Sequence, residues 1–132
     1  MFVTSLYIAL LGIMFFVLSA MVIRQRRKLL VPLGDGGDEM LLRLSRIHGN
    51  FTEIVPVALL LMIALEFQYD TNPVVMHICG TVLVISRLAH AQGLLKSKGT
   101  SLGRMVGTLS AFLLILGMAV ALVILYAISL SG

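Results

Sequence analysis

The stretch from Met105 to Leu130, MVGTLSAFLLILGMAVALVILYAISL, carries no charged side chain. A helix needs roughly 20 predominantly apolar residues to cross the hydrocarbon core of a bilayer, which is about 30 Å thick. This stretch is long enough, and so is the uncharged stretch from Met1 to Ile23. The two ends of the chain therefore predict two membrane-spanning helices.

Two further apolar stretches lie between these ends. Residues 74–95 are interrupted only by His77, Arg87 and His90, and residues 40–67 carry most of their ionisable groups toward their N-terminal half. With 59% hydrophobic and only 12% charged residues, the chain is more apolar than an ordinary soluble domain. We therefore expect an all-α integral membrane protein, one domain over residues 1–132. Its four transmembrane helices, near 1–23, 40–67, 74–95 and 105–130, would form a four-helix bundle.

Basic residues gather around two of the three predicted connections. They are Arg24, Arg26, Arg27, Lys28, Arg43 and Arg46 near the first, and Lys96, Lys98 and Arg104 near the third. The second connection, residues 68–73, has no Lys or Arg. By the positive-inside rule we expect the first and third connections to face the cytoplasm and both termini to face away from it. The same rule, with attraction to anionic membrane lipids, explains the calculated pI of about 9.7 without a nucleic-acid partner.

Arg43, Arg46, Asn50 and Glu53 form a polar stripe on the second predicted helix. Their offsets of three, seven and ten residues place them on a face less than about 90° wide, while His48 points elsewhere. At 1.5 Å per residue, Glu53 lies roughly 10 Å further along the axis than Arg46, inside the apolar layer. Ionisable groups at that depth are costly, and they are candidates for a functional site.

We expect Arg87 to be the partner of Glu53, because it is the basic residue furthest in sequence from the connections. Such an ion pair could serve a site or merely fix the register of two helices. The spacing of Arg87, His90 and Leu94 places all three along one groove. The histidines at positions 48, 77 and 90 lack metal-ligand spacing on a shared helical turn, so no metal is expected.

Two segments resemble a known family. Residues 46–56, RIHGNFTEIVP, are similar to the second-helix signature of the membrane-associated proteins of eicosanoid and glutathione metabolism, the MAPEG family. Residues 86–93, SRLAHAQG, strengthen the resemblance on the third helix, and the four predicted spans extend it over essentially the whole chain. Within the family the chain most resembles the short bacterial members that are like microsomal glutathione transferases.

The resemblance implies a homotrimer that binds glutathione between neighbouring subunits near the cytoplasmic ends of the helices. By position, Arg46, Asn50 and Glu53 would hold glutathione, with His48 as a further polar contact and Arg87 supporting Glu53. Arginine forms bidentate hydrogen bonds with carboxylates, and Glu53 could receive an ammonium group.

The resemblance also suggests which residues would act on the thiol. Arg104, or alternatively Arg24, would favour the thiolate. The chain departs from several eukaryotic relatives in having His90 and Leu94 where they have tyrosines, so a tyrosine-dependent step is not carried over. The implied activity is that of a membrane-bound glutathione transferase or glutathione-dependent peroxidase. Its second substrate would be a lipophilic electrophile or hydroperoxide that enters from the bilayer, and its location a bacterial inner membrane.

Two other functions remain open at this stage. A non-catalytic lipid-binding scaffold would keep the fold and lose the chemistry, as some relatives in the family do. A small channel or transporter has less support. The charged residues gather at one end of the spans, and no row of polar residues continues from there to the other end.

Overall fold

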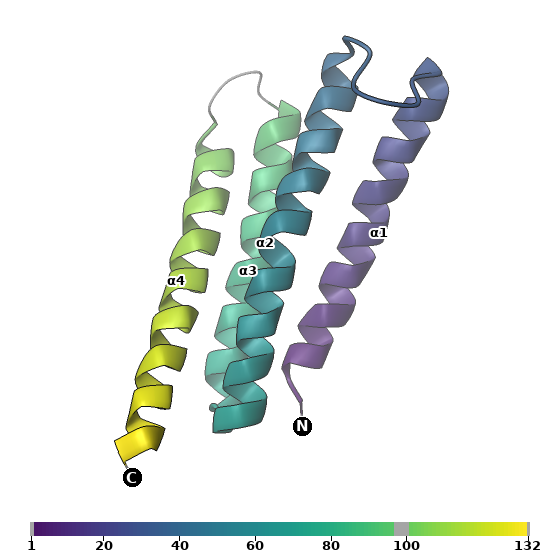
Figure 1. Ribbon diagram of the computed structural model, residues 1–132. Coiled ribbons are helices and arrows are strands. Elements are labelled where there is room, and N and C mark those ends of the chain that lie inside the picture. The colour runs from purple at the N-terminus through teal and green to yellow at the C-terminus, as the bar shows by residue number, and fades with distance from the viewer. Residues whose placement is uncertain (1, 97–100, 132) are drawn as a thin grey trace.

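The computed structural model describes residues 2–96 and 101–131. Their regular structure is α-helical: α1 (Thr4–Leu29), α2 (Glu39–Tyr69), α3 (Pro73–Lys96) and α4 (Leu102–Ser131). All four helices are long and apolar enough to cross a membrane, so the predicted all-α transmembrane bundle is confirmed. The helices lie side by side, with both termini at one end and the connection between α1 and α2 at the other (Figure 1). Lys98, which was counted in the basic third connection, lies outside the described residues.

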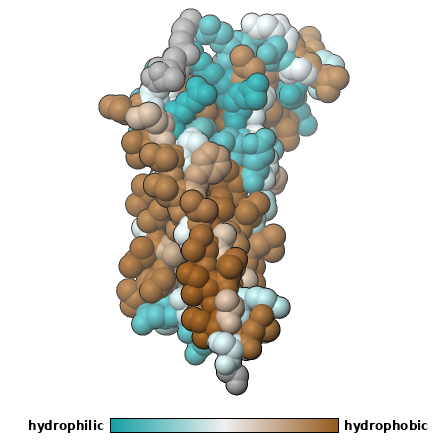
Figure 2. Space-filling view, turned by 60° about the vertical axis from the view of Figure 1, so that its left-hand side comes forward, coloured by the Kyte–Doolittle hydropathy of each residue, from teal (hydrophilic) through white to brown (hydrophobic). Residues whose placement is uncertain are grey.

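The outer surface of the bundle is apolar along most of its length. Figure 2 shows a hydrophobic belt below a hydrophilic end, and this end carries the connection between α1 and α2. Large apolar side chains on all four helices face outward; examples are Phe16, Leu60, Ile85 and Val123. A continuous apolar exterior of this extent is expected where lipid or another membrane-embedded subunit is the neighbour.

Helix α1 extends further than the apolar pattern predicted. The uncharged stretch ends at Ile23, but the helix continues to Leu29, so the basic residues Arg24, Arg26, Arg27 and Lys28 lie in its last turns and not in a loop. Cationic side chains there interact favourably with the partial negative charge of a helix C-terminus. Leu30 caps the helix, and its left-handed φ of 56° lets the N–H of Val31 donate to the carbonyl oxygen of Arg26 at 3.1 Å.

Asp38 begins helix α2 and links it to α1. Its Oδ1 accepts hydrogen bonds from the Leu41 N–H at 2.7 Å and from the Gln25 side chain at 3.2 Å. These two bonds, the Leu41 bond first, hold the pKa of the Asp38 carboxyl below its ordinary value of 3.8. The first turn of α2 is thereby capped, and its start is fixed against the end of α1.

A second set of contacts joins the helices at the end of the bundle that carries the termini. The carboxylate of Glu66, on α2, accepts hydrogen bonds from the N–H groups of Val3 and, at 2.8 Å, Thr4. The first N–H groups of a helix have no partner within it, so Glu66 supplies one from a neighbouring helix.

Helices α3 and α4 form the closest pair of the bundle. At Gly107 an added Cβ atom would lie 2.5 Å from the carbonyl oxygen of Ser86, and at Gly93 it would collide with the backbone nitrogen of Arg104. Only glycine permits so close an approach of two helix backbones. The first turns of α4 are therefore held against the last turns of α3.

Candidate functional site

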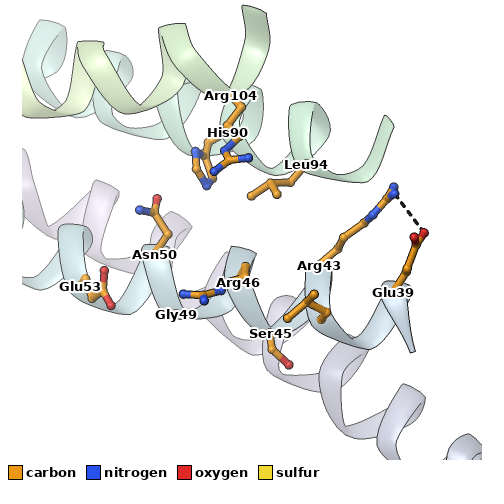
Figure 3. A pocket seen from close by; sticks show the side chains of 11 residues that line it. Glu39, Arg43, Ser45, Arg46, Gly49, Asn50, Glu53, His90, Leu94 and Arg104 are labelled. Atoms are coloured by element: carbon orange, nitrogen blue, oxygen red, sulfur yellow. Dashed lines mark hydrogen bonds and ion pairs between the residues drawn. The ribbon is translucent and has the colours of Figure 1, made fainter. Parts of the chain in front are cut away.

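A cavity of about 690 Å³ opens between helices α2, α3 and α4 at the hydrophilic end of the bundle. Its lining is mostly polar. From α2 come Glu39, Leu42, Arg43, Ser45, Arg46, Gly49, Asn50 and Glu53; from α3, His90 and Leu94; and from α4, Arg104. Figure 3 shows the α2 residues along one wall and His90 and Arg104 together on the opposite wall.

The four residues of the stripe predicted on the second helix lie along one wall of this cavity. Arg43, Arg46, Asn50 and Glu53 all line it, as the helical period requires. The side chains of Arg46 and Glu53 are exposed, and within residues 2–96 and 101–131 neither has a hydrogen-bond or ion-pair partner. A guanidinium and a carboxylate are thus both available in the cavity for a ligand.

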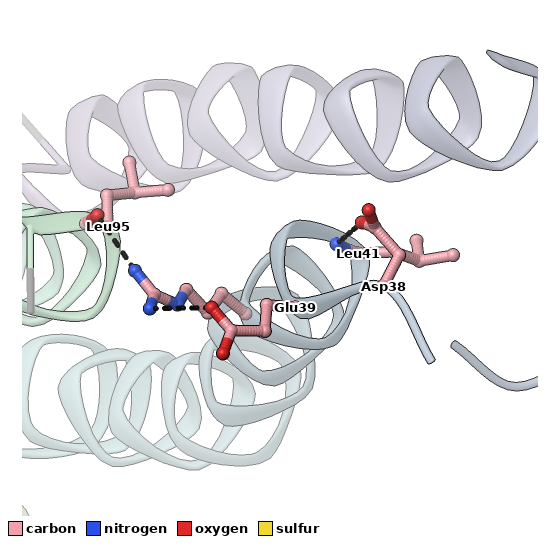
Figure 4. A network of polar contacts seen from close by, with 5 residues as sticks. Asp38, Glu39, Leu41 and Leu95 are labelled. Carbon is pink, nitrogen blue, oxygen red and sulfur yellow. Dashed lines mark hydrogen bonds and ion pairs between the residues drawn. The ribbon is translucent and has the colours of Figure 1, made fainter. Parts of the chain in front are cut away.

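Arg43 holds a structural position at the mouth of the cavity. Its Nη1 donates to the carbonyl oxygen of Leu95 at 3.3 Å, and its Nη2 lies 3.5 Å from Glu39 Oε2 (Figure 4). The first contact satisfies a carbonyl in the last turn of α3, which has no partner within the helix. Arg43 therefore ties the start of α2 to the end of α3.

The predicted pairing of Arg87 with Glu53 is wrong. Arg87 is only 2% exposed, and its Nη1 donates to Asn50 Oδ1 at 2.6 Å while its Nη2 donates to the Gly107 carbonyl oxygen at 2.7 Å. Its Nε donates to Ser86 Oγ at 3.2 Å. The close approach of α4 at Gly107 presents a backbone carbonyl to the guanidinium, and Glu53 lies on the exposed side of α2.

Arg87 consequently lies behind the cavity instead of lining it. Asn50 connects Arg87 to the cavity, because it lines the cavity and also accepts a hydrogen bond from Arg87. Because its oxygen is used by Arg87, the N–H groups of the Asn50 amide are the part left for the cavity. No carboxylate lies within ion-pair distance of Arg87 in the described part of the chain, so a buried positive charge stands behind this wall.

His90 is held from α4 and faces the cavity. The side chain is 6% exposed, and its Nδ1 lies 3.0 Å from the hydroxyl oxygen of Thr108. The other ring nitrogen, Nε2, is buried and has no hydrogen-bond partner among the residues that the structure describes.

Arg104 lies in the first turn of α4, and this turn is capped by Ser101, whose Oγ accepts from the Arg104 N–H at 3.3 Å. Its exposed side chain lines the cavity beside His90 (Figure 3). The cap and the glycine contact with α3 together fix the point from which the guanidinium enters the cavity.

Two predicted candidates lie elsewhere. His48 faces α1, where its Nε2 lies 2.9 Å from Ser19 Oγ and its ring centroid 5.2 Å from that of Phe15. Arg24 is exposed near the end of α1 and is not among the cavity residues. Of the two arginines considered for the thiolate, Arg104 is the one that reaches the cavity.

Apart from Arg104, the sequence analysis missed what α4 supplies to the site. Thr108 orients His90, and the carbonyl oxygen of Gly107 holds Arg87. A usable signal was present in the spacing of Gly103 and Gly107, because small residues four apart are typical of close helix packing in membranes.

The charges of the cavity favour a small ligand that is mainly anionic. Its walls carry three arginines and two glutamates: Arg43, Arg46, Arg104, Glu39 and Glu53. The buried charge of Arg87 adds to the positive side. A ligand with carboxylates and one cationic group would match this arrangement.

Comparisons with known proteins agree with the fold. The model of the MAPEG family matches residues 4–124. The chain is 38% identical over 91 residues to the inner membrane protein YecN of Escherichia coli strain K12, and the alignment covers 69% of each protein. The same figures hold for YecN of Escherichia coli O6:H1 strain CFT073. No solved structure matches the chain.

Proposed function

The chain belongs to the MAPEG family, and from this premise we propose that it is a glutathione transferase or glutathione-dependent peroxidase acting on lipophilic electrophiles or hydroperoxides. The observation that carries the proposal is the cavity of about 690 Å³ within an apolar bundle, which Arg46, Arg104 and Glu53 line together. Its volume lies within the range of pockets that take small organic ligands.

The cavity residues match the functional groups of glutathione. The tripeptide carries carboxylates, an ammonium group and a thiol. Arg46 and Arg104 offer guanidinium groups for the carboxylates, Glu53 offers a carboxylate for the ammonium group, and Asn50 offers amide donors. Placing the ammonium group beside Glu53 would direct the remainder of the ligand toward Arg104 and His90.

The catalytic contribution of such a site is positional and electrostatic. Holding thiol and electrophile together removes much of the entropic cost of their encounter. The arginines favour the thiolate, the reactive form of the thiol. Lipophilic substrates dissolved in the bilayer have direct access to the apolar outer surface of the helices (Figure 2).

The proposal includes a homotrimer in a bacterial inner membrane. The exposed positions of Arg46 and Glu53 leave one side of the cavity open, and a neighbouring copy would close it. The name of the similar Escherichia coli protein supports the inner membrane.

The test is glutathione binding to the detergent-purified protein by isothermal titration calorimetry, together with conjugation of glutathione to a chlorodinitrobenzene-type electrophile. We expect Arg46→Ala to weaken binding by roughly tenfold or more, because it removes a charge-assisted hydrogen bond. Arg27→Ala is the matched control, since Arg27 is an exposed arginine outside the cavity.

Three results can follow. Binding and conjugation that depend on Arg46 but not on Arg27 support the proposal. A wild-type protein that binds no glutathione contradicts it. Lipid binding without glutathione binding would favour the non-catalytic scaffold.

A further inference from the structure

One ring nitrogen of the cavity wall stands out because the described residues leave it without a partner. His90 Nε2 is buried, and the imidazole to which it belongs is more than nine-tenths buried and lines the cavity. A buried polar atom without a hydrogen bond is costly and uncommon in a native structure. The cavity is where a partner for this nitrogen can come from.

The other side of the ring is already fixed. Nδ1 lies 3.0 Å from Thr108 Oγ1, a hydroxyl that can donate to it. The direction of this bond depends on the tautomer of the ring; in the tautomer in which Thr108 donates to Nδ1, the ring proton is on Nε2, and it is this tautomer that makes the free nitrogen a donor. Gly107 makes this contact possible, because it lets α4 approach α3 closely one residue before Thr108.

The surroundings of His90 suit an anion opposite Nε2. The charged groups that face it are Arg87 on its own helix, Arg104 on α4, and Arg46 and Glu53 across the cavity on α2. Helix α1 contributes only apolar residues next to it, Met14 and Leu18. Three of the four charged groups are cationic, and an N–H between them completes a site for negative charge.

We propose that His90 Nε2 donates a hydrogen bond to the sulfur of the bound thiolate and so makes His90 a catalytic residue in thiol activation. This inference rests on the proposed function. In the reaction, the thiol releases its proton to water, and the sulfur forms a bond to the electrophilic carbon. The bond from that carbon to the leaving group breaks, and the leaving group departs with the bonding electrons. His90 keeps its own proton throughout.

The experiment compares three variants with the wild type. His90→Leu removes the donor, His90→Gln keeps an amide N–H at similar reach, and Thr108→Val removes the hydroxyl that orients the ring. The readout is the ultraviolet absorbance of bound glutathione thiolate as a function of pH, with glutathione affinity measured alongside by calorimetry. His77→Gln, at the far end of α3, is the control.

We expect His90→Leu to raise the apparent pKa of the bound thiol by about one unit. At any pH below this pKa, the bound thiol would then contain about tenfold less thiolate. His90→Gln should remain close to the wild type, Thr108→Val should show a smaller rise, and His77→Gln should show none. The arginines and Glu53 are present in every variant, so the shift reports the donor alone. Glutathione affinity below the thiol titration should change little.

The inference is overturned if His90→Leu binds glutathione with an unchanged thiol titration, and the proposed function then survives. It is also overturned if His90→Gln behaves like His90→Leu, because a retained donor should rescue the effect. If His90→Leu does not fold, an unchanged thiol titration in Thr108→Val overturns the inference instead. A wild-type protein that binds no glutathione refutes the proposed function, and this inference with it.

Discussion

Arg87 is the residue on which the site depends structurally. Its guanidinium joins three helices: it lies on α3 and donates to Asn50 on α2 and to Gly107 on α4. A buried cation is tolerated only when its donors are satisfied, and here uncharged oxygens satisfy them. The sequence placed this arginine in the membrane layer but could not assign its partners. Which acceptor it reaches depends on how closely α3 and α4 approach, which is a property of the folded pair.

Replacing Arg87 tests this account. Arg87→Ala should destabilise the protein by about 2–4 kcal/mol, because the hydrogen bonds that link α3 to Asn50 and Gly107 would be lost and the buried side chain would leave a void. The measurement is the free energy of unfolding in detergent, followed by circular dichroism during titration with a denaturing detergent. Arg27→Ala, an exposed arginine, should change it by less than about 0.5 kcal/mol. Equal effects in the two variants would contradict a structural role for Arg87.

At the scale of the helices, the stripe on α2 and Arg104 at the start of α4 could be predicted. The end of α1 and the contacts made by Gly107 and Thr108 on α4 could not. The period of 3.6 residues alone brings Arg46, Asn50 and Glu53 to one face. Hydropathy marks where the apolar layer ends, at Ile23, whereas the helix ends where its hydrogen bonds stop, at Leu29. Helix α4 carries one charge near its start, so its part in the site depends on glycines that only a packed neighbour explains.

The close approach of α3 and α4 gives a prediction for two glycines of one helix. Gly107→Ala should destabilise the protein by about 1–3 kcal/mol, because the added Cβ meets the Ser86 carbonyl and must move one helix. Gly117→Ala is the matched control, since nothing lies within 4 Å of a Cβ there. The same detergent titration measures both. A Gly107→Ala protein as stable as Gly117→Ala would mean that the pair is looser than described.

The cap of α2 predicts a dependence on acid. The pKa of Asp38 is lowered in the folded protein, so its stabilising effect is present above the ordinary value of 3.8 and is lost as the pH falls through the folded value. The protection factor of the Leu41 amide, its hydrogen exchange relative to the intrinsic rate at each pH, should therefore fall in the wild type below about pH 4. Asp38→Asn, which keeps an acceptor that does not titrate in this range, should show a flatter response. Parallel profiles in the two proteins would contradict the assignment.

At the scale of the whole molecule, charge and cavity share one end of the bundle. The basic last turns of α1, the start of α2 and the first turn of α4 lie together, opposite the termini (Figure 1). The positive-inside rule predicts that this end faces the cytoplasm, where the glutathione of the proposed function would be available. The number of spans could be read from length and hydropathy, while the cavity required the four helices in place.

Cysteine labelling tests this orientation. Cys79 is the one cysteine of the sequence, so Cys79→Ser provides a background in which Leu33→Cys and Gln68→Cys can be compared. Both positions are exposed and lie at opposite ends of the bundle. With a membrane-impermeant reagent added from outside the inner membrane, Gln68→Cys should react at once. Leu33→Cys should react only after the membrane is permeabilised, and the reverse order would invert the topology.

The double contact of Asn50 has a thermodynamic consequence. This amide lines the cavity and also accepts a hydrogen bond from Arg87, which in turn donates to Gly107 on α4. A ligand that binds Asn50 is therefore linked to the folding equilibrium of the bundle. A compound present at 100 times its dissociation constant adds about 2.7 kcal/mol to the folded state. Candidate substrates can therefore be ranked by how far each shifts the melting temperature, before any reaction has been assayed.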